Sequence, residues 1–371
     1  MTPTTYRKQE QEPASPEVTE VAPGVLRMQL PVSMPGLGHV NCYALVDSDG
    51  AALVDPGLPG PESWAALGDR LRQAGIPMRR VHTVVVTHSH PDHYGGSHQL
   101  REETGAELLA HAAFTSSPAA GDANADIDLE LLELDPDALV ELWKGKLQER
   151  GQTLWGTRRE PPPDKAIRLF IRTDVAGSLP RFRVPEPTIR AADGDAVRLA
   201  GRDWFAVHTP GHTTDHLCLW DPAEGVLLSG DHVLPTITPH IAGSTDLEDP
   251  LAAFFGSLER VGAFTGVNVC LPAHGHPFTD LRGRTASIRR HHGERLDTLR
   301  AAAAALGRAP VEAYMKELFS ERAWGGMAAS ETFAHLEHLR VIGEAHSSRD
   351  PDGLLHYRLR TPEPAGSQPR A

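Results

Sequence analysis

The sequence contains very little cysteine. Only Cys42, Cys218 and Cys270 occur in 371 residues, far apart from one another and each in an apolar, strand-like context. An odd number of isolated cysteines argues against the disulfide framework of a small secreted domain. We therefore expect all three to be buried free thiols in a reducing compartment.

Long apolar runs are also missing. No stretch approaches the roughly 20 apolar residues that cross a bilayer, and the first residues lack the basic-then-apolar order of a signal peptide. We expect a cytoplasmic protein that does not associate with membranes. Residues 1–17, rich in Thr, Pro, Glu and Gln, are predicted to be disordered ahead of the first strand.

Basic residues are scarce relative to acidic ones. The chain has 36 lysines and arginines and 49 aspartates and glutamates, which gives a net charge of −13. This balance argues against broad attraction to nucleic acid, because neutralising phosphates requires clustered Lys and Arg. It does not exclude a local basic groove. The hydrophobic content of 40% can bury a sizeable core, and the length predicts two domains.

Histidine, by contrast, is abundant, and one segment concentrates it. Directly after an apolar, β-branched run, the chain reads His88-Ser-His90-Pro91-Asp92-His93. Residues two apart in an extended segment point the same way, so His88 and His90 can face one ion. The turn begun by Pro91 directs Asp92 and His93 toward a second. Imidazoles combined with carboxylate favour an open metal site that holds water, which predicts hydrolysis.

Three later segments also run from a strand into a potential ligand. His212 follows a Pro-Gly turn, and Asp231 and His274 each end an apolar run. An isolated His-x-His is usually surface decoration, but these distant residues complete the set. His208 and His276 compete with His212 and His274, and a histidine inside a strand, such as His208, is more commonly structural.

In order and in residue type, these motifs resemble the metallo-β-lactamase superfamily over roughly residues 18–280. The resemblance implies an α+β fold, the αββα sandwich, in which two mixed sheets pack face to face with helices outside and a metal site lies at one edge. Position by position it implies seven ligands: His88, His90 and His212 for a first metal, Asp92, His93 and His274 for a second, and Asp231 bridging the two.

The run Val54-Asp55-Pro56-Gly57 ends the second strand of a hairpin predicted around residues 48–50. The resemblance implies that Asp55 accepts a hydrogen bond from the N–H of a ligand histidine. The alternative is an aspartate that only shapes the turn before Pro56.

The expected ligands predict a mechanism. Two cations that share a water lower its pKa and yield hydroxide, which attacks a carbonyl or phosphorus while a metal stabilises the oxyanion. Asp92 and Asp231 are the predicted catalytic carboxylates, the first orienting the hydroxide and the second setting the separation of the ions. Two zinc ions are expected, with iron or manganese as alternatives. No organic cofactor is indicated.

An insertion at about residues 112–190 separates the first motif from the later ones. It leaves and rejoins the chain beside the metal motifs, so it is predicted to be a lid or pocket wall, with surface decoration as the alternative. A lid rich in Leu, Trp and Phe would suit a partly apolar substrate. The candidate pocket residues are Trp143, Trp155, Phe170, His232 and His240.

Residues 280–371 are predicted to form a separate winged-helix-like domain, with helices at 280–307, 310–319 and 328–342 and a hairpin around 350–353. This layout is similar to the lactamase-like protein 2 subgroup, some of which are described as endoribonucleases. The first helix carries six arginines: Arg282, Arg284, Arg289, Arg290, Arg295 and Arg300. Acidic residues interrupt it and no aromatic platform accompanies it, so packing or a possible homodimer contact is preferred over RNA binding.

Three functions remain open at this stage. The preferred one is a metallo-hydrolase acting on a small ester, thioester or lactone. The second is a metal-dependent endoribonuclease that uses the C-terminal domain to hold RNA. The third, a non-enzymatic regulator, conflicts with the complete set of ligand residues.

Overall fold

The computed structural model describes residues 8–34, 36–115, 137–138, 140–141, 144–145, 151–159, 164, 186–243 and 245–360. Most of the predicted insertion at 112–190 lies outside the described residues, and so do the candidate pocket residues Trp143 and Phe170.

The first sheet has seven strands in sequence order: β1 Val18–Ala22, β2 Val25–Met34, β3 Leu37–Val46, β4 Ala51–Val54, β5 Val81–Val85, β6 Glu107–His111 and β7 Ile189–Ala191. Strands β1 to β4 pair antiparallel, whereas β4 to β7 pair parallel. The hairpin predicted around residues 48–50 is confirmed as β3 and β4. Gly50 takes a φ of 146° there, and a Cβ on it would lie 1.9 Å from the Arg80 carbonyl oxygen.

The second sheet has the order β12-β11-β10-β9-β8. Its strands are β8 Ala196–Leu199, β9 Arg202–His208, β10 Leu217–Asp221, β11 Val226–Gly230 and β12 Val269–Pro272. Only β11 and β12 pair parallel within it. The two sheets meet face to face through an apolar layer in which Tyr43 and Val85 of the first sheet pack with Trp204 and Leu228 of the second.

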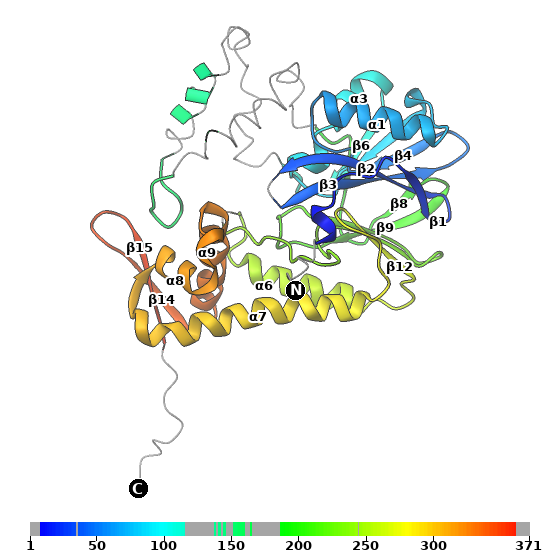
Figure 1. Ribbon diagram of the computed structural model, residues 1–371. Helices are drawn as coiled ribbons and strands as arrows, with labels where there is room; N and C mark the ends of the chain where they lie inside the picture. Colours follow the sequence, from blue (N-terminus) through cyan, green and yellow to red (C-terminus); the bar gives the residue numbers. More distant parts are fainter. Residues whose placement is uncertain are drawn as a thin grey trace, which may run out of the picture.

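Helices cover the outer faces of both sheets (Figure 1). Helices α1 Pro61–Gln73 and α3 Ser97–Thr104 pack on the first sheet, and α6 Pro250–Gly262 and α7 Leu281–Leu306 pack on the second. Successive residues of a buried strand serve the two layers in turn: Val84 and Val86 contact the helix layer, while Val85 faces the other sheet. The predicted αββα sandwich is therefore confirmed.

The C-terminal module contains the helices and hairpin predicted for it. After α7 come β13 Arg308–Pro310, α8 Val311–Leu318, α9 Gly326–Val341, β14 Ala345–Arg349 and β15 Leu355–Leu359. The three strands form a small antiparallel sheet in the order β13-β15-β14. Strand β13 was not predicted, because three residues between two helices carry no period. The winged-helix likeness stays a prediction.

Helix α7 joins this module to the sandwich rather than separating them. It runs along the lower edge of the molecule in Figure 1, from beneath the sandwich to the C-terminal module. One continuous apolar cluster includes Leu227 of the second sheet, Leu258 of α6, Ile288 of α7 and Phe333 of α9. The module therefore shares its core with the sandwich, and a chain cut at residue 280 would expose that core.

The prediction that residues 1–17 are disordered is wrong for residues 8–17, which the structure describes. A short 3-10 helix at Gln9–Gln11 places Glu10 in the interior, fully buried. Its carboxylate accepts hydrogen bonds from the backbone N–H groups of Thr236 (2.8 Å) and Ile237 (3.0 Å). The polar composition of this segment gave the wrong expectation of disorder, because a polar segment can be ordered when its carboxylate accepts hydrogen bonds from backbone N–H groups elsewhere in the protein.

Two expectations drawn from missing features can also be compared with the structure. Cys42, Cys218 and Cys270 are buried free thiols, as predicted, and burial raises the pKa of Cys218 to about 12. Among the described residues, no helix combines the length and the apolar character that a membrane span requires.

We predict that Glu10→Ala destabilises the protein by about 1–3 kcal/mol, because it leaves two half-buried N–H groups without their acceptor. Chemical denaturation would measure this loss. Glu17→Ala, at an exposed position of the same segment, should change the free energy of unfolding by less than about 0.5 kcal/mol. Equal effects of the two variants would show that the segment is not held by Glu10.

Candidate metal centre

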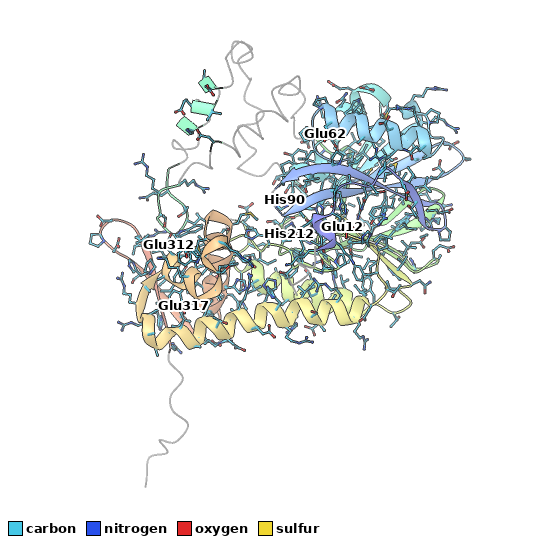
Figure 2. The ribbon with its side chains drawn as sticks, in the orientation of Figure 1. Glu12, Glu62, His90, His212, Glu312 and Glu317 are labelled. Carbon is cyan, nitrogen blue, oxygen red and sulfur yellow. The ribbon has the colours of Figure 1, made fainter. Side chains whose placement is uncertain are left out.

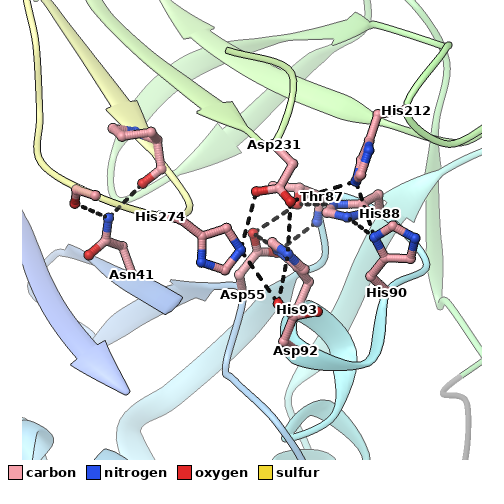
Figure 3. A network of polar contacts seen from close by, with 12 residues as sticks. Asn41, Asp55, Thr87, His88, His90, Asp92, His93, His212, Asp231 and His274 are labelled. Atoms are coloured by element: carbon pink, nitrogen blue, oxygen red, sulfur yellow. Dashed lines mark hydrogen bonds and ion pairs between the residues drawn. The ribbon is translucent and has the colours of Figure 1, made fainter. Parts of the chain in front are cut away.

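The seven predicted ligands lie together at one edge of the sandwich, where strands of both sheets end (Figure 3). They form two groups, each with its ligand atoms within 4.8 Å of one another: His88, His90, His212 and Asp231 in the first, and Asp92, His93 and His274 in the second. Figure 2 shows His90 and His212 on the side of the sandwich that faces the C-terminal module.

Strand ends and short loops bring these side chains together. His88 and His90 lie in the loop after β5, and Pro91 begins the one-turn helix α2 Pro91–Tyr94, which carries Asp92 and His93. Proline suits the first helical position because its missing N–H would have no partner there. Asp231 and His274 follow the parallel neighbours β11 and β12, and His212 follows β9.

Backbone carbonyls orient two of the imidazoles from behind. The Nδ1 atom of His212 lies 2.6 Å from the carbonyl oxygen of His240, and the Nδ1 atom of His274 lies 2.6 Å from that of His39. A carbonyl accepts only, so each Nδ1 carries the proton and donates it. The Nε2 lone pair of each ring is left facing the cluster, the usual arrangement of a histidine that binds a metal.

Asp55 orients a third imidazole. Its Oδ2 atom lies 2.8 Å from Nδ1 of His93 and accepts a further hydrogen bond of 2.8 Å from the hydroxyl of Thr87. The Thr87 hydroxyl also lies 3.0 Å from Nδ1 of His88. Because its own proton is donated to Asp55, the hydroxyl oxygen accepts a hydrogen bond from Nδ1–H of His88. Asp55 is buried with a φ of 55°, a backbone conformation that costs energy in a non-glycine residue. The strained turn directs its carboxylate toward His93 and Thr87, and Thr87 in turn contacts His88.

His216, which the sequence reasoning missed, positions Asp231. The backbone N–H of Asp231 donates to Nε2 of His216 (3.0 Å), so Nδ1 of that ring donates to the hydroxyl of Thr209 (2.7 Å). Gly230 leaves room for the ring, because a Cβ there would lie 2.6 Å from Nε2 of His216. The feature of the sequence that could have identified His216 is its position directly before the apolar run that forms β10.

Burial and charge set the protonation of the cluster. Burial lowers the pKa of His90 and of His212 to about 3, so both rings are neutral and their lone pairs are available at neutral pH. Burial also acts to lower the pKa of His93, but the carboxylates of Asp92, Asp55 and Asp231 raise it to about 10. These carboxylates create a strongly negative potential in the enclosed space, which favours a cation.

Several buried polar atoms in the cluster have no hydrogen-bond partner. They include Nε2 of His93, Nε2 of His274 and Oδ1 of Asp231. The last two atoms face each other across 3.4 Å without forming a hydrogen bond. Unpaired buried atoms are costly unless something else satisfies them, and nitrogen and carboxylate donors directed at one space fit a divalent metal.

The competing histidines lie outside the cluster. His208 approaches the Thr214 carbonyl oxygen with Nε2 (2.8 Å) and stacks on His111 with ring centroids 3.8 Å apart. His276 lies 2.9 Å from the carboxylate of Glu12. Neither belongs to a group of potential ligands among the described residues.

The structure corrects the predicted pocket role of Trp155. Its ring packs on Phe333 of α9 with centroids 5.3 Å apart, and its indole N–H donates to Glu312 of α8 (2.9 Å). Trp155 therefore belongs to the core shared with the C-terminal module. Sequence spacing could not reveal this partner, which lies more than 150 positions away.

Of the other two described candidates, His232 also differs from the expectation, whereas a pocket role for His240 stays a prediction. His232 is fully buried against the ring of Phe254, with centroids 5.2 Å apart, so it contributes to packing rather than to an open pocket wall. His240 acts through its backbone on His212, while its imidazole Nδ1 lies 3.5 Å from the carboxylate of Glu331.

Comparison with known proteins identifies the family. The family model described as metallo-beta-lactamase superfamily matches residues 35–305, which span most of the chain. The chain belongs to the metallo-β-lactamase superfamily. A similar curated protein is the probable metallo-hydrolase YqjP of Bacillus subtilis, 25% identical over 85% of this chain and 92% of that protein. Together with the fold, this makes the chain a metallo-hydrolase.

Two solved structures agree over nearly the whole length. A beta-lactamase domain protein from Burkholderia ambifaria is 29% identical with a TM-score of 0.72, and the match covers 94% of this chain and 96% of that one. The metallo-β-lactamase family protein TTHA1429 from Thermus thermophilus is 28% identical with a TM-score of 0.67, covering 92% of this chain and all of that one (100%). Both matches extend into the C-terminal module.

Relatives named as thioesterases match smaller parts. The acyl-coenzyme A thioesterase MBLAC2 of Bos taurus is 27% identical over 53% of this chain and 58% of that protein. An atrochrysone carboxyl ACP thioesterase of Aspergillus chevalieri is 31% identical over 31% of this chain and 40% of that protein. The chain thus spans about half the length of these thioesterases.

We predict that Asp55→Ala weakens zinc affinity by roughly 10- to 100-fold, because the His93 ring loses the acceptor that fixes its orientation and tautomer. Competition with a chromophoric chelator would measure the affinity. Asp203→Ala, at an exposed position on β9, serves as the matched control and should bind zinc like the wild type. Unchanged affinity of the Asp55 variant would contradict the orienting role.

Proposed function

We propose that this protein hydrolyses small acyl thioesters, with esters and lactones as chemically related substrates, at a centre of two divalent metal ions, preferably zinc. The observation that supports this most strongly is the convergence of the seven candidate ligands, six of them buried, with unpartnered nitrogens of His93 and His274 among the atoms directed inward. Iron and manganese accept the same donors and are the alternatives.

In this proposal His88, His90 and His212 would hold one ion, and Asp92, His93 and His274 would hold the other. The position of Asp231 supports its role as a bridge. Its Oδ2 atom lies 3.6 Å from Nε2 of His212, and its Oδ1 atom lies 3.4 Å from Nε2 of His274. The two oxygens of one carboxylate thus face one histidine of each set.

Bound divalent cations supply Lewis-acid polarisation of a carbonyl and make water acidic near neutral pH. The chain itself supplies acceptors and orientation. Burial acts to raise the pKa of Asp92, but His93 and His274 hold it far below its usual range, so this residue is a carboxylate. As a carboxylate it accepts a hydrogen bond from the attacking water and orients it. His216, through the N–H of Asp231, keeps the second carboxylate in place.

The thioester class follows from the thioesterase-named relatives and from the chemistry of the site. Acyl thioesters, esters and lactones all present a carbonyl carbon to a nucleophile activated in this way. The insertion at 112–190 is still proposed as a lid, with Trp143 and Phe170 as apolar contacts, although these residues lie outside the described part of the chain. Cytoplasmic location and homodimer formation likewise stay predictions.

The ribonuclease alternative finds no support on α7. Arg284 donates to backbone carbonyls, Arg289 and Arg295 form ion pairs with Glu259 and Glu331, and Arg300 forms one with Glu344. Four of the six arginines are used in this way, and the two others, Arg282 and Arg290, are exposed but do not make a continuous basic face for phosphates by themselves. We therefore do not propose RNA as a substrate.

The metal-loaded full chain should hydrolyse acyl-coenzyme A thioesters, and Asp231→Asn should reduce kcat by at least about 100-fold, because it removes a shared ligand. Free-thiol release gives the rate. His274→Gln and His276→Gln form a matched pair, two residues apart with only the first in the cluster. The first should lose activity and the second should retain it.

Phosphodiesters and short RNAs complete the substrate panel. Turnover of these alone, with a steep dependence on salt, would overturn the thioester assignment in favour of nuclease activity. Full activity of Asp231→Asn on any substrate would overturn the metal-dependent mechanism itself.

A further inference from the structure

A second group of potential metal ligands lies outside the centre described above. His292 of α7 meets Glu331 and His335 of α9, with one ligand atom from each residue within 4.8 Å of the others. Glu331 and His335 are four residues apart on one helix, so their side chains share a face. All three residues are buried, and both imidazoles are completely so.

These side chains occupy positions where apolar residues are expected. The buried stripe of α7 runs through Leu281, Ile288, His292, Leu296 and Leu299. A histidine in such a stripe must have a partner, because burying an unpaired polar group is costly. Yet Nε2 of His292 is buried without any hydrogen-bond partner. Hydrogen bonding within the protein therefore does not fully account for this residue.

The geometry repeats that of the catalytic cluster. Nδ1 of His335 lies 2.7 Å from the carbonyl oxygen of Glu331 and donates to it, which leaves the Nε2 lone pair directed at His292. Nδ1 of His292 lies 3.1 Å from Nε2 of His335 and donates a hydrogen bond to it, so the two nitrogens already face each other across a short gap. Two nitrogens bound to one tetrahedral zinc at the usual bond length are separated by roughly 3.3 Å. In the catalytic cluster, Nε2 of His212 and Nδ1 of His90 are likewise 3.1 Å apart.

The electrostatics of the group suit a cation. Burial lowers the pKa of His292 to about 3 and that of His335 to about 4, so both rings are neutral. Burial acts to raise the pKa of Glu331, but His240 and Arg295 lower it to about 2. Arg295 pairs with Oε1 of this carboxylate, and metal-binding carboxylates are commonly held by such a partner.

We propose that His292, Glu331 and His335 bind a divalent transition-metal ion, with zinc as the preferred occupant, at a site separate from the hydrolytic centre. Two imidazoles and one carboxylate form a donor set that zinc, cobalt and iron accept. The ion fastens α9 to α7, and hence the C-terminal module to the helix that it shares with the sandwich. The site also adjoins the catalytic one, because His240 faces Glu331 with its ring and His212 with its carbonyl.

The decisive experiment counts ions in the full chain. After equilibrium dialysis against zinc, elemental analysis should find one ion fewer per chain in His292→Gln/His335→Gln than in the wild type. This difference does not depend on how many ions the hydrolytic centre holds. His338→Gln is the matched control: it removes a histidine of α9 that lies 2.8 Å from Asp249 and outside the group, and it should lose no zinc.

A second background separates the two sites. The variant His88→Ala/His90→Ala/His274→Ala disables the hydrolytic centre, and it should still bind one equivalent of Co²⁺ with the visible absorption of a histidine-ligated ion. Adding Glu331→Gln, which keeps the size of the side chain, should weaken this binding at least about tenfold. Equal zinc content in the first comparison, or no cobalt binding in this background, would overturn the proposal.

Discussion

The structure depends on one constraint. A polar side chain that points into a buried space must have its orientation fixed by a hydrogen bond from its other polar atom to an acceptor outside that space. Four of the cluster histidines donate from Nδ1 to an acceptor outside it, namely the carbonyls of His240 and His39, the carboxylate of Asp55 and the hydroxyl of Thr87. These bonds fix both the orientation of the rings and the nitrogen that carries the proton. Without them the same histidines could rotate or change tautomer, and the inward lone pairs would no longer converge. The loops at this edge of the sandwich thus supply the hydrogen-bond acceptors that orient the histidines.

That requirement links the catalytic edge to distant parts of the chain. The carbonyl of His240 belongs to the segment that follows Asp231, and its ring faces Glu331 of the C-terminal module. Glu10, near the N-terminus, holds the backbone at Thr236 and Ile237 in the same segment. The N-terminal segment 8–17, the second sheet and helix α9 therefore all help to position the loop that orients His212. This explains why the module cannot be regarded as an appendage, which agrees with the apolar core that it shares with α6 and the second sheet.

The charge distribution shows why a cation belongs in such an interior. Three carboxylates surround His93 and raise its pKa to about 10, whereas burial lowers the pKa of His90 and of His212 to about 3. An enclosed site that combines ionised carboxylates with neutral imidazoles is costly by itself and is stabilised by a metal ion. The group between α7 and α9 has the same combination on a smaller scale, with one carboxylate and two neutral rings.

The sequence by itself determined the strands that lead into the ligand motifs and the order of those motifs, because alternation and turn chemistry are local properties that a single chain displays. The resemblance to the superfamily, rather than any local period, favoured His212 and His274 over His208 and His276. Only the tertiary structure revealed three contacts. They are the hydrogen bond between His216 and the N–H of Asp231, the packing of Trp155 on Phe333, and the hydrogen bond between Glu10 and Thr236. Each of these depends on a partner whose distance is set by the packing of sheets and helices, and no local period encodes that distance. The pairing of His292 with His335, 43 positions apart, is of the same kind. Residue type marked both as potential ligands, but only the crossing of α7 and α9 placed them side by side.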